Sequence, residues 1–327
     1  MTILEQTKQL CQMYGIKPAR AKGQNFLISE NVYDKIIQAA RLSKDDTVLE
    51  VGPGFGFLTM KMAQKVKKVV AVEVDRELAD VFKTEATAIA IKNIEIVHGD
   101  ILSVVARSQS LKLGSAAAGT VLNLCSQPQV KVSNSFAERE TSLKLGGTPR
   151  HDSGYKIVAN LPYNITSIFL RKFLSEVENK PHMMVLMLQK EVVERILAKP
   201  GQMSLLAVSV QFYAQAEKVM DVPKENFWPQ PQVESAIIKL QIAKFRMQND
   251  NVKISIDEQK FFRMVKIGFS AKRKQLQHNL AAGLHIAKEQ GRDFLKEIKL
   301  NEKARPQELS LDDWHKLYLV LDSRNML

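Results

Sequence analysis

The chain has 327 residues, a length typical of about two domains. Hydrophobic residues make up 45% and charged residues 25%, an ordinary globular composition that excludes a mainly disordered chain, a collagen and a disulfide scaffold. The 47 Lys and Arg residues outnumber the 35 Asp and Glu residues, which gives a formal net charge of +12. This excess favours a polyanionic partner such as nucleic acid, although a merely basic soluble enzyme fits the charge as well.

The few cysteines point to a reducing compartment, and the short apolar runs give no sign of a membrane span. Cys11 and Cys125 lie in neither a CxxC pair nor a Cys/His cluster, so we expect no disulfide framework and no metal site. Apolar runs such as Met183–Leu188 are too short to span a bilayer, and Glu5 and Lys8 interrupt any signal-peptide core. We therefore expect a cytoplasmic protein with no membrane contact, and a monomer.

Short β-branched runs alternate with helical patterns through the first two-thirds of the chain. We expect seven strands, at Thr47–Val51, Val69–Val74, Ile94–His98, Lys156–Asn160, Met183–Leu188, Leu205–Tyr213 and Ala236–Leu240. Phe57–Lys65 and Arg76–Ile91 have helical patterns. This alternation predicts an α/β fold, in which a mostly parallel sheet carries helices on both faces.

The C-terminal part of the sequence has no strong strand pattern after Leu240. Residues 257–320 are expected to form several helices, one of which begins at Ser310 with Asp313 three positions on, as in a capping box. Residues 241–327 hold 17 basic and 11 acidic side chains and are the most positive part of the chain. We therefore predict one domain at residues 1–243 and a helical, basic domain at residues 244–327, where contact with a nucleic acid is expected.

One long stretch, about residues 103–154, is rich in Ser, Gly, Ala and Thr and has no sustained period. A structureless loop of this length is uncommon inside a compact domain. Its six basic and three acidic residues favour contact with RNA, and a passive insertion is the alternative.

Three consecutive strand ends carry residues suited to an adenosyl ligand. Gly52 and Gly54 lie in a GxGxG turn, where the lack of side chains lets the backbone approach a ligand closely. A tight strand-to-helix connection that binds no ligand is the alternative. Glu73 ends the next strand, where a carboxylate accepts both ribose hydroxyls, and Asp100 follows the third strand, where it can bond an adenine edge. No basic residue for a polyphosphate follows the glycines, so S-adenosylmethionine is the candidate cofactor.

The tetrapeptide Asn160-Leu161-Pro162-Tyr163 follows the strand that begins at Lys156. The Asn160 side-chain oxygen and a carbonyl of Leu161 or Pro162 can accept hydrogen bonds from an exocyclic amine, and the Tyr163 ring offers a face on which a base can stack. Two acceptors direct the nitrogen lone pair at a methyl group, so positioning supplies most of the catalysis. An Asn-x-Pro turn that only closes a strand is the alternative.

These motifs, in this order, resemble the KsgA-type ribosomal RNA adenine dimethyltransferases, whose fold the erythromycin-resistance methyltransferases share. The matching segments are Gly23–Leu27, Glu50–Gly56, Glu73–Asp75, Gly99-Asp100, Asn160–Thr166, Phe227–Pro231, Val233–Ala236 and Gly268–Lys274. The resemblance covers nearly the whole chain except the stretch at about residues 103–154, which is much shorter in the family.

The resemblance implies a Rossmann-like class I methyltransferase fold with a smaller helical C-terminal domain. It further implies S-adenosylmethionine-dependent dimethylation of N6 on two adjacent adenosines, in the hairpin near the 3′ end of small-subunit rRNA, during ribosome biogenesis. The partner would be this rRNA in the assembling small subunit.

By the same resemblance, two sets of residues line the site. Those that would bind the cofactor are Asn25, Leu27, Gly52, Gly54, Glu73, Asp100 and Asn160. Tyr163 and Phe227 would cover the two faces of a flipped adenine, since a base must be extruded before its amino group is reached. Phe227 fits core packing as well.

Lys272, Arg273 and Lys274 are expected to contact the RNA backbone, although a solvated helix face is the usual place for such a triplet. Two other functions stay open: a large-subunit adenine methyltransferase, and an assembly factor in which methylation is secondary or lost. The intact glycine turn and Asn160–Tyr163 favour retained catalysis.

Overall fold

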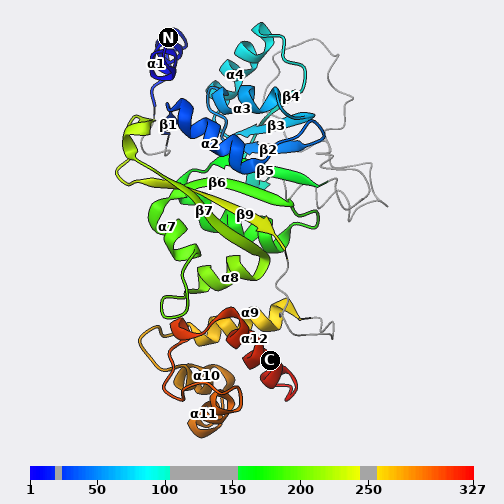
Figure 1. Ribbon diagram of the computed structural model, residues 1–327, viewed down its shortest axis with the longest axis vertical. Coiled ribbons are helices and arrows are strands. Elements are labelled where there is room, and N and C mark those ends of the chain that lie inside the picture. Colours follow the sequence, from blue (N-terminus) through cyan, green and yellow to red (C-terminus); the bar gives the residue numbers. More distant parts are fainter. Residues whose placement is uncertain (19–23, 104–153, 244–255) are drawn as a thin grey trace, which may run out of the picture. The chain divides into compact units, whose positions relative to one another are not determined.

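The computed structural model describes residues 1–18, 24–103, 154–243 and 256–327 (Figure 1). Nearly all of the stretch predicted as an insert, and with it the hypothesis that it contacts RNA, lies outside the described residues, as does Gly23 of the first matching segment. In the described part of the chain, no helix combines the length and the apolar character needed to cross a membrane.

The described chain divides into two compact units. The first comprises Met1–Leu186 with Lys224–Pro231, and the second comprises Met187–Pro223 with Gln232–Leu327. The domain boundary predicted between residues 243 and 244 borders a range without a description, and it remains a prediction.

The fold is α/β, as the sequence predicts. Strands of one sheet follow the order β4-β3-β2-β5-β6-β9-β7, and β1 pairs with β8 in a separate two-stranded sheet (Figure 1). The strands are β1 (Phe26–Leu27), β2 (Thr47–Val51), β3 (Lys68–Glu73), β4 (Ile94–His98), β5 (Tyr155–Asn160), β6 (Met183–Gln189), β7 (Ala214–Val222), β8 (Phe227–Trp228) and β9 (Ser235–Ile242). Six of the seven predicted strands are confirmed to within a residue or two.

In the first unit, β2 pairs in parallel with β3 on one side and with β5 on the other, and β3 pairs in parallel with β4. Strands β2, β3 and β5 are buried along most of their length, as expected where both faces of a parallel sheet are covered. The strand order reverses between β2 and β5. Open α/β sheets bind ligands beyond the carboxyl ends of strands at such a switch point.

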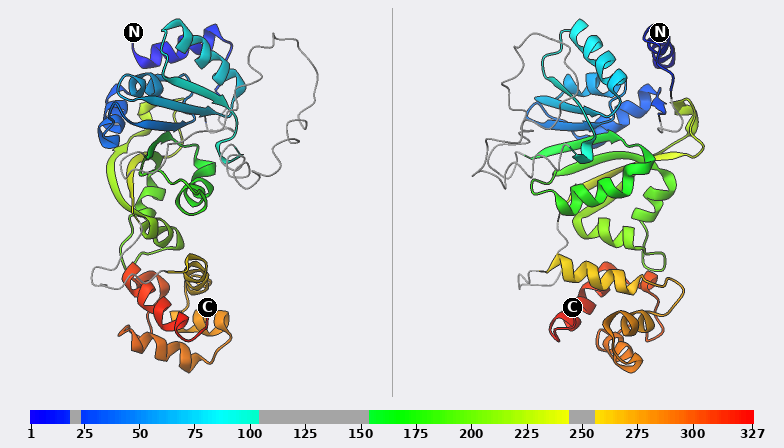
Figure 2. Two further views of the ribbon diagram at one scale, coloured as in Figure 1. Left: turned by 90° about the vertical axis from the view of Figure 1, so that its right-hand side faces the viewer. Right: turned by 180° about the vertical axis from the view of Figure 1, so that it is seen from behind.

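Helices connect these strands, and the two further views of Figure 2 show them around the sheet. Within the described residues, the α-helices of the first unit are α1 (Ile3–Met13), α2 (Glu30–Ala40), α3 (Phe57–Ala63), α4 (Arg76–Ala88) and α6 (Thr166–Arg171). The predictions at α3 and α4 are confirmed, whereas α1, α2 and α6 were not predicted. Asp75 begins α4 by accepting hydrogen bonds from the N–H groups of Glu77 and Leu78.

The second unit corrects one predicted strand. Leu205–Tyr213 forms helix α8, which begins where the Ser204 side chain accepts a hydrogen bond from the N–H of Ala207. The sequence of α8 is apolar almost throughout, because the helix is buried on several sides. Such a run lacks the hydrophobic periodicity that distinguishes a helix from a strand. The next strand, β7, was not predicted because its exposed positions carry charges that conceal the alternation.

Four helices make up the C-terminal part of this unit: α9 (Glu258–Gly268), α10 (Leu276–Leu284), α11 (Lys288–Glu297) and α12 (Leu311–Asp322). The helices predicted within residues 257–320 are thus confirmed, including the capping box of Ser310 and Asp313 at the start of α12. Shorter helical elements of the chain include α7 (Lys190–Ile196), also in this unit.

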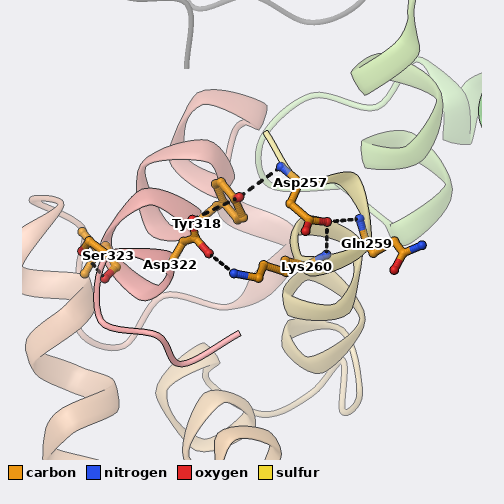
Figure 3. A network of polar contacts seen from close by, with 7 residues as sticks. Asp257, Gln259, Lys260, Tyr318, Asp322 and Ser323 are labelled. Atoms are coloured by element: carbon orange, nitrogen blue, oxygen red, sulfur yellow. Dashed lines mark hydrogen bonds and ion pairs between the residues drawn. The ribbon is translucent and has the colours of Figure 1, made fainter. Parts of the chain in front are cut away.

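Polar contacts join the start of α9 to the end of α12 (Figure 3). The Tyr318 hydroxyl accepts a hydrogen bond from the N–H of Asp257 at 3.1 Å, and Lys260 Nζ lies 2.7 Å from the Asp322 carboxylate. The Asp257 carboxylate in turn caps α9 by accepting from the N–H groups of Gln259 and Lys260. These contacts fix how the first and last helices of the bundle meet.

Candidate functional site

A glycine turn leads from β2 into α3 at the switch point of the sheet. Gly52, Gly54 and Gly56 all have positive φ angles, of 68°, 58° and 81°. L-residues with a side chain rarely adopt this backbone, so glycine is required for the turn. A Cβ at Gly52 would lie 3.9 Å from the backbone oxygen of Asn160, so the ends of β2 and β5 approach each other closely here.

A pocket opens at this point. Its wall includes Leu27, Tyr33, Glu50, Gly52, Gly54 and Asn160. Four of these residues were predicted to bind the cofactor, and the structure brings them together from the start, the middle and the second half of the first unit.

Strand β1 and helix α2 contribute one side of the pocket. The Tyr33 hydroxyl donates a hydrogen bond to the backbone oxygen of Leu27 at 2.6 Å, which holds β1 against α2. The Phe26 ring packs on Phe55 of the glycine turn, with 4.8 Å between ring centroids. Neither Tyr33 nor Phe55 was predicted as part of the site, since each is an apolar or aromatic residue in an unremarkable sequence context.

Glu73 connects the end of β3 to the glycine turn. Its carboxylate accepts hydrogen bonds from the N–H of Gly54 at 3.2 Å and from the N–H of Asp75 at 3.0 Å. The side chain is 5% exposed, and this burial raises the pKa of Glu73. A carboxylate has about four lone-pair sites, so Glu73 keeps acceptor capacity for hydroxyl groups of a ligand.

Glu50 is the second buried carboxyl group of the site, and sequence reasoning gave it no role. It is 2% exposed, and the Thr59 hydroxyl of α3 donates a hydrogen bond to it at 2.5 Å. Burial raises the pKa of Glu50 to about 8, and the nearby Glu73 carboxyl adds to the increase. The signal available in the sequence was its place two residues before Gly52 of the glycine turn.

Three predicted cofactor residues, Glu73, Asp100 and Asn25, lie outside the pocket wall in the described structure. Asp100 is exposed, and its carboxylate accepts hydrogen bonds from the N–H of Leu102 and the hydroxyl of Ser103, which makes it a local helix cap. Asn25 is half-buried, directly before Phe26 of β1. Their roles as ligands of a cofactor remain predictions.

The residues expected to bind the target base show two levels of exposure. Asn160, Pro162 and Tyr163 are half-buried at the carboxyl end of β5, whereas Leu161 is 1% exposed. Phe227 is 2% exposed and pairs with Leu27 across β1 and β8, so core packing is its use in this structure. Its role beside a flipped base remains a prediction.

Lys272, Arg273 and Lys274 are all exposed, in the turn between α9 and α10. They do not form a helix face, which was the alternative interpretation of the triplet. Among the described residues, no three His, Cys, Asp or Glu side chains gather as metal ligands do.

The donor set fits an adenosyl cofactor. Glycines keep side chains out of the turn, and the buried carboxyl groups of Glu50 and Glu73 suit a ligand that carries hydroxyl groups and positive charge. Val74, next to Glu73, is 65% exposed and offers an apolar contact for a planar base.

Comparison with known proteins gives the family. A sequence model described as "Ribosomal RNA adenine dimethylase" matches residues 17–323. The chain belongs to the ribosomal RNA adenine dimethylase family. A member of this family is a methyltransferase enzyme, and the resemblance stated above is thereby confirmed.

Two relatives support the family assignment over nearly the whole chain. It is 36% identical to Ribosomal RNA small subunit methyltransferase A of Dehalococcoides mccartyi strain CBDB1, over 97% of the chain and 93% of the relative. It is 34% identical to the protein of the same name from Clostridioides difficile strain 630, over 97% of the chain and 96% of the relative.

Two solved structures share the fold of the chain. A dimethyladenosine transferase from Plasmodium falciparum superposes with a TM-score of 0.66 at 25% identity, over 91% of the chain and 97% of that structure. The 23S rRNA methyltransferase ErmE superposes with a TM-score of 0.60 at 22% identity, over 91% of the chain and all of that structure, and shows the fold alone.

Proposed function

We propose that the protein uses S-adenosylmethionine to dimethylate N6 of two adjacent adenosines in the 3′-terminal hairpin of small-subunit rRNA, in the cytoplasm, during ribosome biogenesis. The single observation that carries the proposal is the meeting of the glycine turn and Asn160 at the switch point of the sheet, in a chain of this family. The names of the two relatives support the small subunit as the substrate.

For the cofactor, we propose that Glu73 holds the ribose hydroxyls and that Val74 and Asp100 bind the adenine. Gly52 and Gly54 leave room for the methionine end, and Leu27 closes the pocket with Asn25 nearby. When bound, the cofactor supplies an electrophilic methyl group on a positively charged sulfur. The basic side chains of the protein then attract the RNA, while the carboxyl groups attract the cationic cofactor.

For the target base, we propose that the Asn160 side-chain oxygen and the carbonyl of Leu161 or Pro162 accept hydrogen bonds from the adenine N6 amino group. These two acceptors orient the nitrogen lone pair for in-line attack, and Tyr163 stacks on the extruded ring. The amino proton leaves to solvent only after methyl transfer has made the nitrogen acidic. No strong general base is therefore required.

The deciding experiment supplies purified small subunits with S-adenosylmethionine carrying a labelled methyl group. Asn160→Ala removes one acceptor, so we expect the methylation rate to fall at least about 100-fold while the melting temperature stays near wild type. Asn164→Ala is the matched control, because Asn164 is an exposed residue of the short 3-10 helix that follows β5, and this variant should keep its rate. Equal label in wild type and Asn160→Ala would contradict the mechanism.

Mapping the labelled nucleotides separates this function from the two alternatives. Label on adenosines of the large subunit would favour the erythromycin-resistance type. Tight binding to small subunits without any label would favour an assembly factor in which methylation is lost.

A further inference from the structure

We propose that Glu50 is a neutral carboxylic acid in the free protein, and that it releases its proton to solvent when a positively charged ligand occupies the pocket. The inference rests on the proposed use of an adenosyl cofactor. It makes Glu50 a ligand-binding residue whose charge state follows the occupancy of the site.

The place of Glu50 in the sheet explains why it is neutral. It precedes the last residue of β2 and pairs with Ala71 of β3 and Val158 of β5, between two strands that are themselves buried. The side chain is 2% exposed, yet it forms part of the pocket wall. Ionising a carboxyl group in such a place costs free energy unless a partner of opposite charge is near.

The groups that face Glu50 do not supply that partner. Thr59 of α3 donates one hydrogen bond, the Tyr33 phenol of α2 lies on the same pocket wall, and the Glu73 carboxyl of β3 repels negative charge. Asn160 at the end of β5 is a neutral amide. Among the described residues, no Lys or Arg forms an ion pair with Glu50, so positive charge has to come from the ligand.

The proton balance of the step is simple. In the free protein the O–H bond of the Glu50 carboxyl group is intact. When a cation enters the pocket, that bond breaks, the proton passes to buffer, and the carboxylate that remains neutralises part of the ligand's charge. Binding is therefore tighter at higher pH, until Glu50 is ionised before the ligand arrives.

The test measures protons rather than activity. Full-length protein is titrated calorimetrically with S-adenosylmethionine at pH 6.5, in two buffers with different enthalpies of ionisation. Because burial raises the pKa of Glu50 to about 8, we expect release of close to one proton for each ligand bound, and an affinity that rises roughly tenfold per pH unit below pH 8. Binding with no proton release would overturn the inference.

Glu50→Gln keeps the shape and the acceptor for Thr59 but has no proton to release. We expect it to bind more weakly, with release close to zero. Glu77→Gln, at an exposed position in the first turn of α4, is the matched control and should release as many protons as wild type. Equal release by Glu50→Gln and wild type would also overturn the inference.

A measurement on the free protein separates this inference from the proposed cofactor. The infrared band of a protonated carboxyl group should be present at pH 6.5, should disappear with a midpoint near pH 8, and should be weaker in Glu50→Gln. Absence of the band in wild type would reject the inference whatever the protein binds. Failure to bind S-adenosylmethionine, with the band present, would instead reject the proposed cofactor.

Discussion

Two buried carboxyl groups, Glu50 and Glu73, dominate the electrostatics of the site at the scale of single residues. Burial raises the pKa of both, and Glu50 reaches about 8. In the unfolded chain these groups return to ordinary values near 4.5. Between these two pH values the folded protein binds more protons than the unfolded chain, so its stability falls as pH rises through the window from about 4.5 to about 8.

Replacing Glu50 with Gln should remove most of this pH-dependent loss of stability. Relative to wild type, we expect the free energy of unfolding of Glu50→Gln to increase as pH rises from about 5 to about 8, by a total on the order of 4 kcal/mol. Denaturant titrations at a series of pH values measure the difference. Stability curves that run parallel across this range would show that Glu50 ionises normally in the folded protein.

The contrast between Glu50 and Asp100 shows what residue patterns can and cannot predict. The approach of Gly52 and Gly54 to Asn160 was predictable because strand ends of a parallel sheet meet at a switch point. Leu27 lies on the antiparallel pair β1 and β8, and only the family resemblance indicated it. The burial of Glu50 was not predictable, since it depends on strands β3 and β5 that pair on either side. The cap that Asp100 forms with its own neighbours is equally compatible with the sequence pattern.

At the scale of secondary-structure elements, the turn from β2 into α3 depends on Gly56. It begins α3 with φ 81°, and a Cβ at this position would lie 2.0 Å from the Phe82 ring of α4. The turn therefore fits only if Gly56 has no side chain, and α4 presses directly against the loop that forms the pocket.

Gly56→Ala should destabilise the protein by about 2–5 kcal/mol, because backbone strain and overpacking add. Gly201→Ala is the matched control, since Gly201 has φ 103° with nothing within 4 Å of a Cβ, and strain alone should cost about 1–2 kcal/mol. Denaturant titration compares the two. Equal losses would mean that Phe82 moves aside at no cost.

Elements were predictable to different extents for a physical reason. Thr47–Val51 was predicted to the residue because β-branched side chains run directly into Gly52, which ends the strand. The strand predicted at Leu205–Tyr213 was wrong because a helix that is apolar on nearly all sides has no sequence period to detect. Strand β7 was not predicted for the opposite reason, since its exposed charged side chains give it the sequence pattern of a loop.

The distribution of charge matters at the scale of the whole molecule. Lys272, Arg273 and Lys274 are exposed together in one turn, within the most basic part of the chain. Phosphate contacts release counterions, so RNA affinity that depends on this triplet should fall steeply with salt.

Replacing all three residues with Glu should lower affinity for small-subunit rRNA at least tenfold, and should reduce the slope of log affinity against log salt by about 2–3. The matched control replaces Arg263, Lys266 and Lys316, which are exposed on α9 and α12, and changes the net charge equally. Filter binding at several salt concentrations measures both. Equal losses of RNA affinity in the two variants would mean that binding depends on the overall charge of the protein rather than on this turn.

The pairing of β1 with β8 has a consequence for synthesis of the protein. Leu27, in the pocket wall, is paired with Phe227, a residue that follows 200 positions later in the chain. A nascent chain emerges from its N-terminus, and β1 waits without its partner strand while β2 to β7 are translated. The pocket is therefore completed late, so a truncated translation product that stops before Phe227 lacks a finished binding site even though every glycine of the turn is present.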